Sequence, residues 1–128
     1  MIRVLTYGNF DLFHVGHVRL LERASLLGDE LYIGLSTDEF SFKGKSKETI
    51  IPYNQRYEVL KSCRYVTEIF PEFHWNQKIR DIQYYNIDIF VMGDDWRGKF
   101  DFLKEHCEVI YLSRTPDIST TYLKDILK

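Results

Sequence analysis

The stretch RVLTYGNFDLFHVGHVRLLERASLLGDELYIGLS, residues 3 to 36, contains the pattern that decides the fold. It begins with a short β-branched and apolar run at 3–7 and ends with another at 30–36, as buried strands do. Between these runs, apolar residues recur with helical spacing, and Gly28 stands where a helix C-cap is expected. The predicted apolar helix face consists of Val15, Val18, Leu20, Leu21, Ala24 and Leu27. The stretch therefore predicts a strand, a helix and a second strand in succession.

The same alternation continues through the rest of the chain. Further strands are expected at 66–70, 87–92 and 108–112. Further helices are expected at 52–62, where Pro52 suits a first helical turn, and at 74–86 and 119–127. Alternating strands and helices with nearly continuous apolar strands predict an α/β, Rossmann-like fold, in which helices cover both faces of a mostly parallel five-stranded sheet.

Length and composition fit one domain spanning residues 1–128. A chain of 128 residues with 45% hydrophobic residues can bury a core without disulfides or a structural metal, and it shows no repeat or linker. The chain has 17 basic and 19 acidic residues, so its net charge of -2 is too small to attract a nucleic acid or an anionic membrane. We therefore expect no nucleic-acid partner and no membrane partner. Cys63 and Cys107 lack metal-ligand spacing and are expected to be reduced thiols. With no signal-like or membrane-spanning segment, these features favour a cytoplasmic protein.

Ligands of such sheets bind beyond the carboxyl ends of the strands. Four segments follow predicted strands and contain most of the unusual polar residues: 8–17, 36–47, 93–101 and 113–121. The Lys-rich part of the second, residues 43–47, is expected to be a mobile loop. Trp96 and Phe100 in the third are expected to pack in the core.

Two histidines, His14 and His17, lie at the start of the first predicted helix, with Gly16 between them. Unpaired backbone N–H groups and the helix dipole favour an anion there, imidazoles can donate to phosphate oxygens, and glycine permits close approach. A metal pair is less well supported because two ligands leave a zinc site incomplete. Ordinary surface or capping histidines remain an equal alternative at this point.

Three motifs resemble a known family. HVGH resembles the HxGH signature of the nucleotidyltransferase superfamily, and RTPDISTT at 114–121 is similar to its RTxGISTT tail. The stretch 93–115 is similar to bacterial glycerol-3-phosphate cytidylyltransferases, and the resemblance covers essentially the whole chain. It implies that CTP and glycerol 3-phosphate give CDP-glycerol and pyrophosphate for teichoic-acid or capsular polysaccharide synthesis. Mg²⁺ would accompany CTP, and the protein would be a homodimer.

The resemblance also implies roles for individual residues. The catalytic residues would be His14, His17, Lys45 and Arg114. CTP would be bound by Asn9, Phe10, Asp11, His14, Gly16, His17, Lys47, Gly93, Asp94, Arg114, Thr115, Ile118, Ser119, Thr120 and Thr121. The acceptor would be bound by Lys45, Arg56, Arg64 and Lys78. No protein metal site is expected.

Several of these residues have simpler interpretations. Lys43, Lys45 and Lys47 fit a solvated charged loop, and Arg56 fits an exposed helix face. Ser119 fits a helix cap. Asp94 could accept from the cytosine amino group, form a turn or help hold Mg²⁺.

Two positions depart from the family pattern. Asn9 stands where threonine is usual, and Asp117 stands where glycine is usual, which brings a carboxylate near the proposed phosphate site. Three functions therefore compete: the glycerol 3-phosphate enzyme, an enzyme with another phosphorylated alcohol or with ATP, and a catalytically silent nucleotide-binding module.

Overall fold

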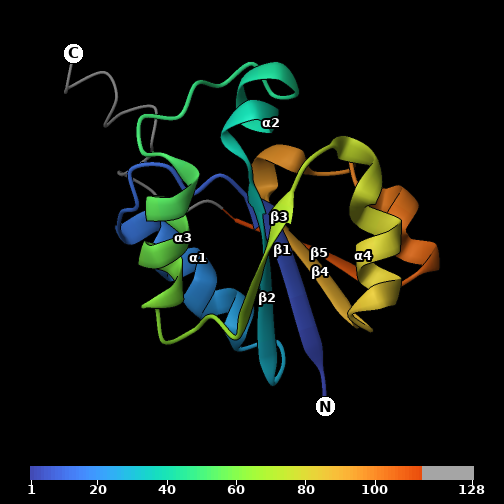
Figure 1. Cartoon of the computed structure of the whole chain (residues 1–128). Helices are drawn as coiled ribbons and strands as arrows, with labels where there is room; N and C mark the ends of the chain where they lie inside the picture. The colour runs from blue at the N-terminus through green and yellow to red at the C-terminus, as the bar shows by residue number, and fades with distance from the viewer. Residues whose placement is uncertain (114–128) are drawn as a thin grey trace.

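The computed structural model describes residues 1–113, and it contains one sheet flanked by helices (Figure 1). The strands are β1 (Arg3–Gly8), β2 (Glu30–Ser36), β3 (Glu68–Glu72), β4 (Ile89–Gly93) and β5 (Glu108–Leu112). They form one five-stranded sheet in the order β3-β2-β1-β4-β5, and every neighbouring pair is parallel. The predicted Rossmann-like α/β class is confirmed. The predicted helix at 119–127 lies outside the described residues.

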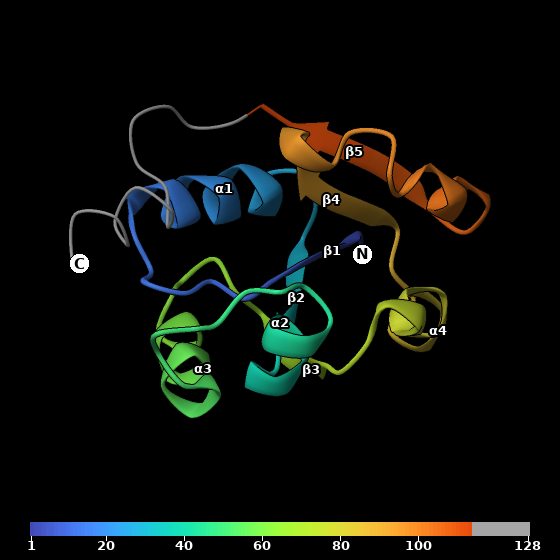
Figure 2. The ribbon, with the colours of Figure 1, turned by 90° about the horizontal axis from the view of Figure 1, so that it is seen from above.

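The helices lie on both sides of the sheet, as expected. They are α1 (Val15–Ser25), α2 (Asp38–Lys43), α3 (Tyr53–Lys61) and α4 (Lys78–Tyr84), with short 3-10 turns η1 (Trp75–Gln77), η2 (Asp94–Trp96) and η3 (Asp101–Glu105). Viewed from above, α1 and α3 flank one face and α4 flanks the other (Figure 2). Among residues 1–113, no helix has the length and apolarity needed to cross a bilayer.

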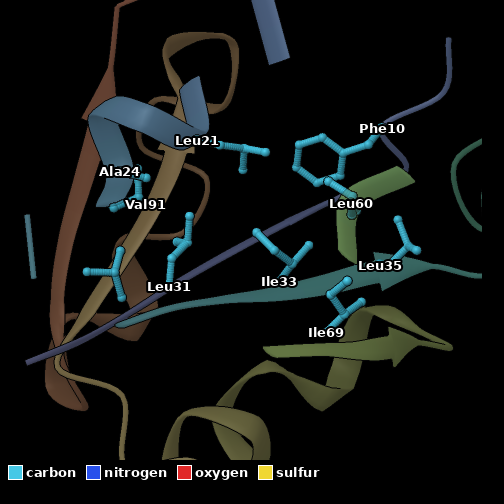
Figure 3. Packing of buried hydrophobic residues seen from close by; sticks show 10 residues of the cluster. Phe10, Leu21, Ala24, Leu31, Ile33, Leu35, Leu60, Ile69 and Val91 are labelled. Atoms are coloured by element: carbon cyan, nitrogen blue, oxygen red, sulfur yellow. The ribbon is translucent and has the colours of Figure 1, made fainter. Parts of the chain in front are cut away.

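A separate core fills each side of the sheet. On the first side, Leu21 and Ala24 of α1 and Leu60 of α3 pack against apolar strand residues such as Ile33 and Val91 (Figure 3). The core of the second side contains these residues from the strands, α4, the turn before β4 and the 95–103 region: Leu5, Tyr7, Tyr32, Phe70, Ile82, Ile87, Phe90, Met92, Phe100 and Leu103. Phe100 is buried there and Trp96 is partly buried against this core, so both are packing residues as predicted.

Helix α1 differs in two details from its prediction. It ends at Ser25 with Leu26 as C-cap, so Gly28 is not the cap residue. A Cβ at Gly28 would lie 2.8 Å from the Ile2 carbonyl oxygen, so glycine serves the close approach of this turn to the first strand. Val15 is exposed and does not belong to the buried face.

Other element boundaries also move. β3 begins two residues later than predicted, with the Tyr32–Glu68 pair, and just before it the Thr67 hydroxyl accepts from the Leu31 backbone N–H at 2.9 Å. β3 can contain Pro71 because it is an edge strand, where a missing N–H costs no ladder bond. The segment 38–43 is a helix, not a loop: the Thr37 side chain caps it by accepting from Phe40 N.

Candidate active site

The carboxyl ends of the parallel strands lie at one edge of the sheet, beneath α2 in Figure 1. The segment 9–14 follows β1 at this edge. Ser36, Glu72 and Gly93 are the last residues of β2, β3 and β4. The predicted ligand-binding segments that lie within residues 1–113 therefore meet at this edge, as the general rule for open α/β sheets requires.

His14 and His17 close the N-terminus of α1 with a reciprocal capping box. His14 Nδ1 accepts from the Gly16 backbone N–H at 3.0 Å, and His17 Nδ1 accepts from the His14 N–H at 3.2 Å. In a neutral imidazole only one nitrogen carries hydrogen, so these bonds assign the hydrogen of each ring to Nε2. The capping interpretation of the histidines is thus correct, and the capping itself turns both rings into Nε2–H donors.

The surroundings keep these imidazoles neutral. Burial lowers the pKa of His17 to about 3, with a smaller contribution from His14, while Asp11 acts in the opposite direction. Burial also lowers the pKa of His14. The two rings stack with centroids 3.9 Å apart, and Phe10 and Phe13 pack against His17 at 5.4 and 5.5 Å. Fixed, neutral donors of this kind suit an anion that must be bound without a proton being transferred.

Asp11 and Arg56 connect the loops around these histidines. The fully buried Asp11 carboxylate accepts from the N–H groups of Ile50 and Ile51 at 2.8 and 2.9 Å. Arg56 donates to the carbonyl oxygens of Asn9, Ser36 and Ile51, each at 2.8 Å. It also pairs with the Asp38 carboxylate at the start of α2.

These contacts change the interpretation of Arg56. Only 2% of it is exposed, so the simpler alternative of an exposed helix face is wrong. Its three carbonyl partners come from three separate segments, which identifies Arg56 as a residue that positions the loops. Asn9 and Phe10 lie in the same loop: Asn9 Oδ1 accepts from Asp11 N at 3.2 Å, and Phe10 is buried with a positive φ of 49°.

Lys45 and Lys78 meet at one carboxylate. Lys45 Nζ lies 3.2 Å from Glu72 Oε1, and Lys78 Nζ lies 2.8 Å from Glu72 Oε2. The loop at 43–47 is therefore held here through Lys45, so the simpler interpretation of a solvated lysine is wrong at this residue. Trp75 anchors the loop further, because its Nε1–H donates to Gly44 O at 3.0 Å. Lys47 is exposed, and its backbone N–H donates to Ser41 O at 2.7 Å.

Gly93 ends β4, the strand next to β1, and Asp94 follows it. A Cβ at Gly93 would meet nothing within 4 Å, so the backbone there is open to an approaching group. The Asp94 carboxylate accepts from Arg97 Nε at 2.7 Å and forms an ion pair with the same guanidinium. These residues are at the expected edge, with the carboxylate partly engaged.

Arg64 does not lie at this edge of the sheet. It is exposed and donates to the Tyr65 hydroxyl at 2.9 Å, and this hydroxyl donates to Glu22 late in α1. Since the neighbouring Thr67 pairs with Leu31 at the start of β2, Arg64 lies at the amino ends of the strands. The expected contact of Arg64 with acceptor is therefore not supported by its position in a single chain.

The predicted tail residues Arg114, Thr115, Asp117, Ile118, Ser119, Thr120 and Thr121 lie outside the described residues. The last described residue, Ser113, is tied to α1: Arg23 donates to its carbonyl oxygen at 2.7 Å and to its hydroxyl at 3.3 Å. The chain thus leaves β5 beside the helix whose N-terminus carries the two histidines.

Sequence reasoning missed Glu72, Ser36 and Trp75. Glu72 is fully buried and Trp75 is partly exposed, and both lie just past the predicted strand at 66–70. A strand drawn two residues later would have placed Glu72 at the ligand-binding edge, where a buried acid demands a cationic partner. The sequence pattern did not extend the strand to Glu72 because Pro71 precedes it, and proline usually ends a predicted strand.

Comparison with known proteins identifies the family. Residues 5–126 match the family model described as cytidylyltransferase-like. The chain is 59% identical over 124 residues to the glycerol-3-phosphate cytidylyltransferase of Bacillus spizizenii, covering 97% of this chain and 95% of that protein. It is 53% identical over 127 residues to the same enzyme of Staphylococcus aureus, covering 99% and 96%. The chain belongs to the cytidylyltransferase-like family.

More distant matches to this cytidylyltransferase-like chain have names other than glycerol-3-phosphate cytidylyltransferase. A FAD synthase of Thermococcus onnurineus is 36% identical over 104 residues, covering 81% of this chain and 69% of that protein. Among solved structures, a lipopolysaccharide core biosynthesis protein of Thermoplasma volcanium matches with a TM-score of 0.75 at 24% identity, covering 90% of this chain and 98% of that one. This last likeness shows the shared fold.

Proposed function

We propose that a single domain, residues 1–128, transfers a cytidylyl group from CTP to glycerol 3-phosphate and releases CDP-glycerol and pyrophosphate. The observation that carries this proposal is the pair of neutral, Nε2-protonated histidines at the N-terminus of α1, on the ligand-binding edge of the sheet. The choice of nucleotide and acceptor follows the relatives that share 53–59% of their residues with this chain.

The reaction needs no general base. A phosphate oxygen of glycerol 3-phosphate is already ionised near neutral pH and attacks the α-phosphorus of CTP. A new phosphorus–oxygen bond forms as the bond to the bridging oxygen of the β-phosphate breaks, and pyrophosphate leaves with that electron pair. The Nε2–H groups of His14 and His17 donate to the α-phosphoryl oxygens, where charge develops in the transition state.

The remaining site residues bind and orient the two substrates. Lys45 and Lys78 bind the acceptor phosphate, and Lys47 reaches CTP. The open backbone at Gly93 and the carboxylate of Asp94 recognise cytosine. Arg114, Thr115, Ile118, Ser119, Thr120 and Thr121 hold the β- and γ-phosphates. Phe10, Asp11 and Arg56 position the loops, and Asn9 and Gly16 let the triphosphate approach the start of α1.

Magnesium enters as the complex with CTP. Within residues 1–113, no group of three or more His, Cys, Asp or Glu side chains could hold a metal ion, and the Asp11 carboxylate is bonded to the 50–51 backbone. These residues do not fit a resident metal, and the ion would arrive as part of the nucleotide substrate. We further propose a homodimer acting in the cytoplasm, with CDP-glycerol used for a teichoic-acid or capsular polymer.

A panel of nucleotides against acceptors tests the function. Pyrophosphate and the CDP-alcohol are measured for CTP or ATP with glycerol 3-phosphate, phosphocholine, phosphoethanolamine and a polyol phosphate. The proposal requires turnover with CTP and glycerol 3-phosphate to exceed every other pair by at least about tenfold in kcat/KM. A better pair elsewhere in the panel would reassign the substrate, and tight CTP binding with no turnover would identify a silent module.

A further inference from the structure

We propose that Glu72 is a positioning residue for the acceptor phosphate: its carboxylate holds the side-chain amino groups of Lys45 and Lys78 side by side at the carboxyl ends of β2 and β3. This inference rests on the proposed function, in which these two lysines bind glycerol 3-phosphate. Glu72 itself is expected to touch no substrate, since its side chain is fully buried.

The geometry joins two distant parts of the chain through this one side chain. Glu72 Oε1 accepts from Lys45 Nζ at 3.2 Å and from Ser36 Oγ at 2.8 Å, and Ser36 Oγ in turn accepts from Lys45 Nζ at 2.8 Å. Glu72 Oε2 accepts from Lys78 Nζ at 2.8 Å. Because Ser36 and Glu72 are paired across β2 and β3, the sheet itself fixes the position of this carboxylate.

The charges explain why an acid belongs beneath a phosphate site. Two ammonium groups in a buried space repel each other and lose hydration, so an uncompensated pair would be strongly destabilising. One carboxylate offsets one charge and leaves a net charge of about +1 from the three groups for an incoming phosphate. The 12% exposure of the Lys45 side chain, against 2% for Lys78, makes Lys45 the more accessible of the two.

The protonation of Lys45 depends on this carboxylate. Burial lowers the pKa of Lys45, the Coulombic attraction and hydrogen bond of Glu72 raise it, and the charges of Lys78 and Lys47 lower it. Phe40 and Trp75 also face the ammonium, with ring centroids at 5.2 and 5.6 Å. Removing the charge of Glu72 would therefore take away the Coulombic attraction that raises the pKa of Lys45, while burial and the charges of Lys78 and Lys47 would continue to lower it.

The first test compares the full-length protein with Glu72→Gln, which preserves side-chain shape. NMR of ¹³C-labelled lysine side chains measures the pKa of Lys45, whose signal is assigned with Lys45→Arg. This pKa should be lower in the variant than in the wild type. The KM for glycerol 3-phosphate should rise about tenfold or more, while the KM for CTP changes less than about threefold. In the variant alone, kcat/KM for the acceptor should fall as the pH rises from 7.5 to 9.5. An unchanged Lys45 titration and acceptor KM would overturn the proposal.

Three further variants separate positioning from a general loss of structure. Asp81→Asn removes another buried carboxylate, which accepts from Tyr7 and Gln77, and should leave the acceptor pH profile flat. Glu72→Asp should restore the flat profile by restoring the charge.

If Glu72→Gln does not fold, Ser36→Ala is the deciding variant. A severalfold higher KM for the acceptor supports the proposal, and an unchanged KM overturns it. A wild-type protein that makes no CDP-glycerol would refute the proposed function, whereas the Lys45 titration would still test Glu72.

Discussion

His14 and His17 show that one side chain can serve local structure and chemistry together. Each uses Nδ1 to cap α1, and this use leaves the hydrogen on Nε2. The sequence predicted their place at a helix start and offered capping and phosphate binding as alternatives. The sequence could not reveal that capping produces the geometry for phosphate binding, because the tautomer of each histidine depends on which backbone N–H its ring accepts from.

His14→Asn separates the two roles of His14. Asparagine is a strong N-cap residue and can accept from the Gly16 N–H as the imidazole does, but it places no donor at the Nε2 position. We expect the free energy of unfolding to stay within about 0.5 kcal/mol of wild type, while kcat falls on the order of 100-fold. Urea denaturation and single-turnover kinetics measure the two effects. Retained turnover would remove His14 from the transition state.

The low pKa of His17 makes the protein less stable in acid. The pKa of about 3 in the folded state lies below the usual value of about 6.5, so between these values the unfolded chain binds a proton that the folded chain does not. This cost is close to zero at about pH 7.5 and grows as the pH falls through the unfolded-state pKa, reaching about 1.4 kcal/mol at pH 5.5.

His17→Gln tests this linkage while keeping an accepting side chain at the third helical position. We expect the variant to lose about 1.4 kcal/mol less stability than wild type between pH 7.5 and pH 5.5. Denaturant unfolding at the two pH values measures the difference. Parallel losses in both proteins would show that His17 titrates normally in the folded state.

At the level of the elements, buried polar residues align the loops that follow the strands. Arg56 of α3 reaches the segments after β1 and β2, and Asp11 binds the 50–51 backbone that precedes α3. The strand and helix pattern was predictable from apolar spacing. These cross-connections were not, because they depend on which loops the topology brings together and not on any local pattern.

Arg56→Lys should weaken this connection without removing the positive charge. A lysine has a single donor head and cannot reach three carbonyl oxygens and a carboxylate at once. We expect a loss of at least about 2 kcal/mol in unfolding free energy by urea denaturation. Arg80→Lys, on the exposed surface of α4, is the matched control and should change stability by less than about 0.5 kcal/mol. Equal effects of the two substitutions would contradict the positioning role.

At the scale of the whole molecule, the parallel sheet collects residues that lie far apart in sequence at one edge. The end of β1 contributes the histidine segment, the end of β2 contributes Ser36, and the end of β3 contributes Glu72. The sequence predicted the sheet and the edge but not the strand order, which follows from pairing between distant segments. Glu72 was missed because its strand was placed two residues too early.

CTP binding across several elements should stabilise the whole fold. A ligand that binds only the folded state contributes about 2.7 kcal/mol at one hundred times its Kd. We therefore expect CTP to raise the melting temperature by several degrees, and ATP at the same concentration to raise it less. Thermal unfolding followed by circular dichroism measures both shifts, and equal shifts would contradict cytosine recognition at the edge of the sheet.

The most direct test of the central claim is a crystal structure of the protein with a non-hydrolysable CTP analogue and glycerol 3-phosphate. Oxygens of the α-phosphate should lie about 3 Å from Nε2 of both His14 and His17. The acceptor phosphate should contact Lys45 and Lys78, with both lysines still held by Glu72. A triphosphate bound away from the start of α1, or histidines whose Nε2 atoms face away from it, would contradict the account.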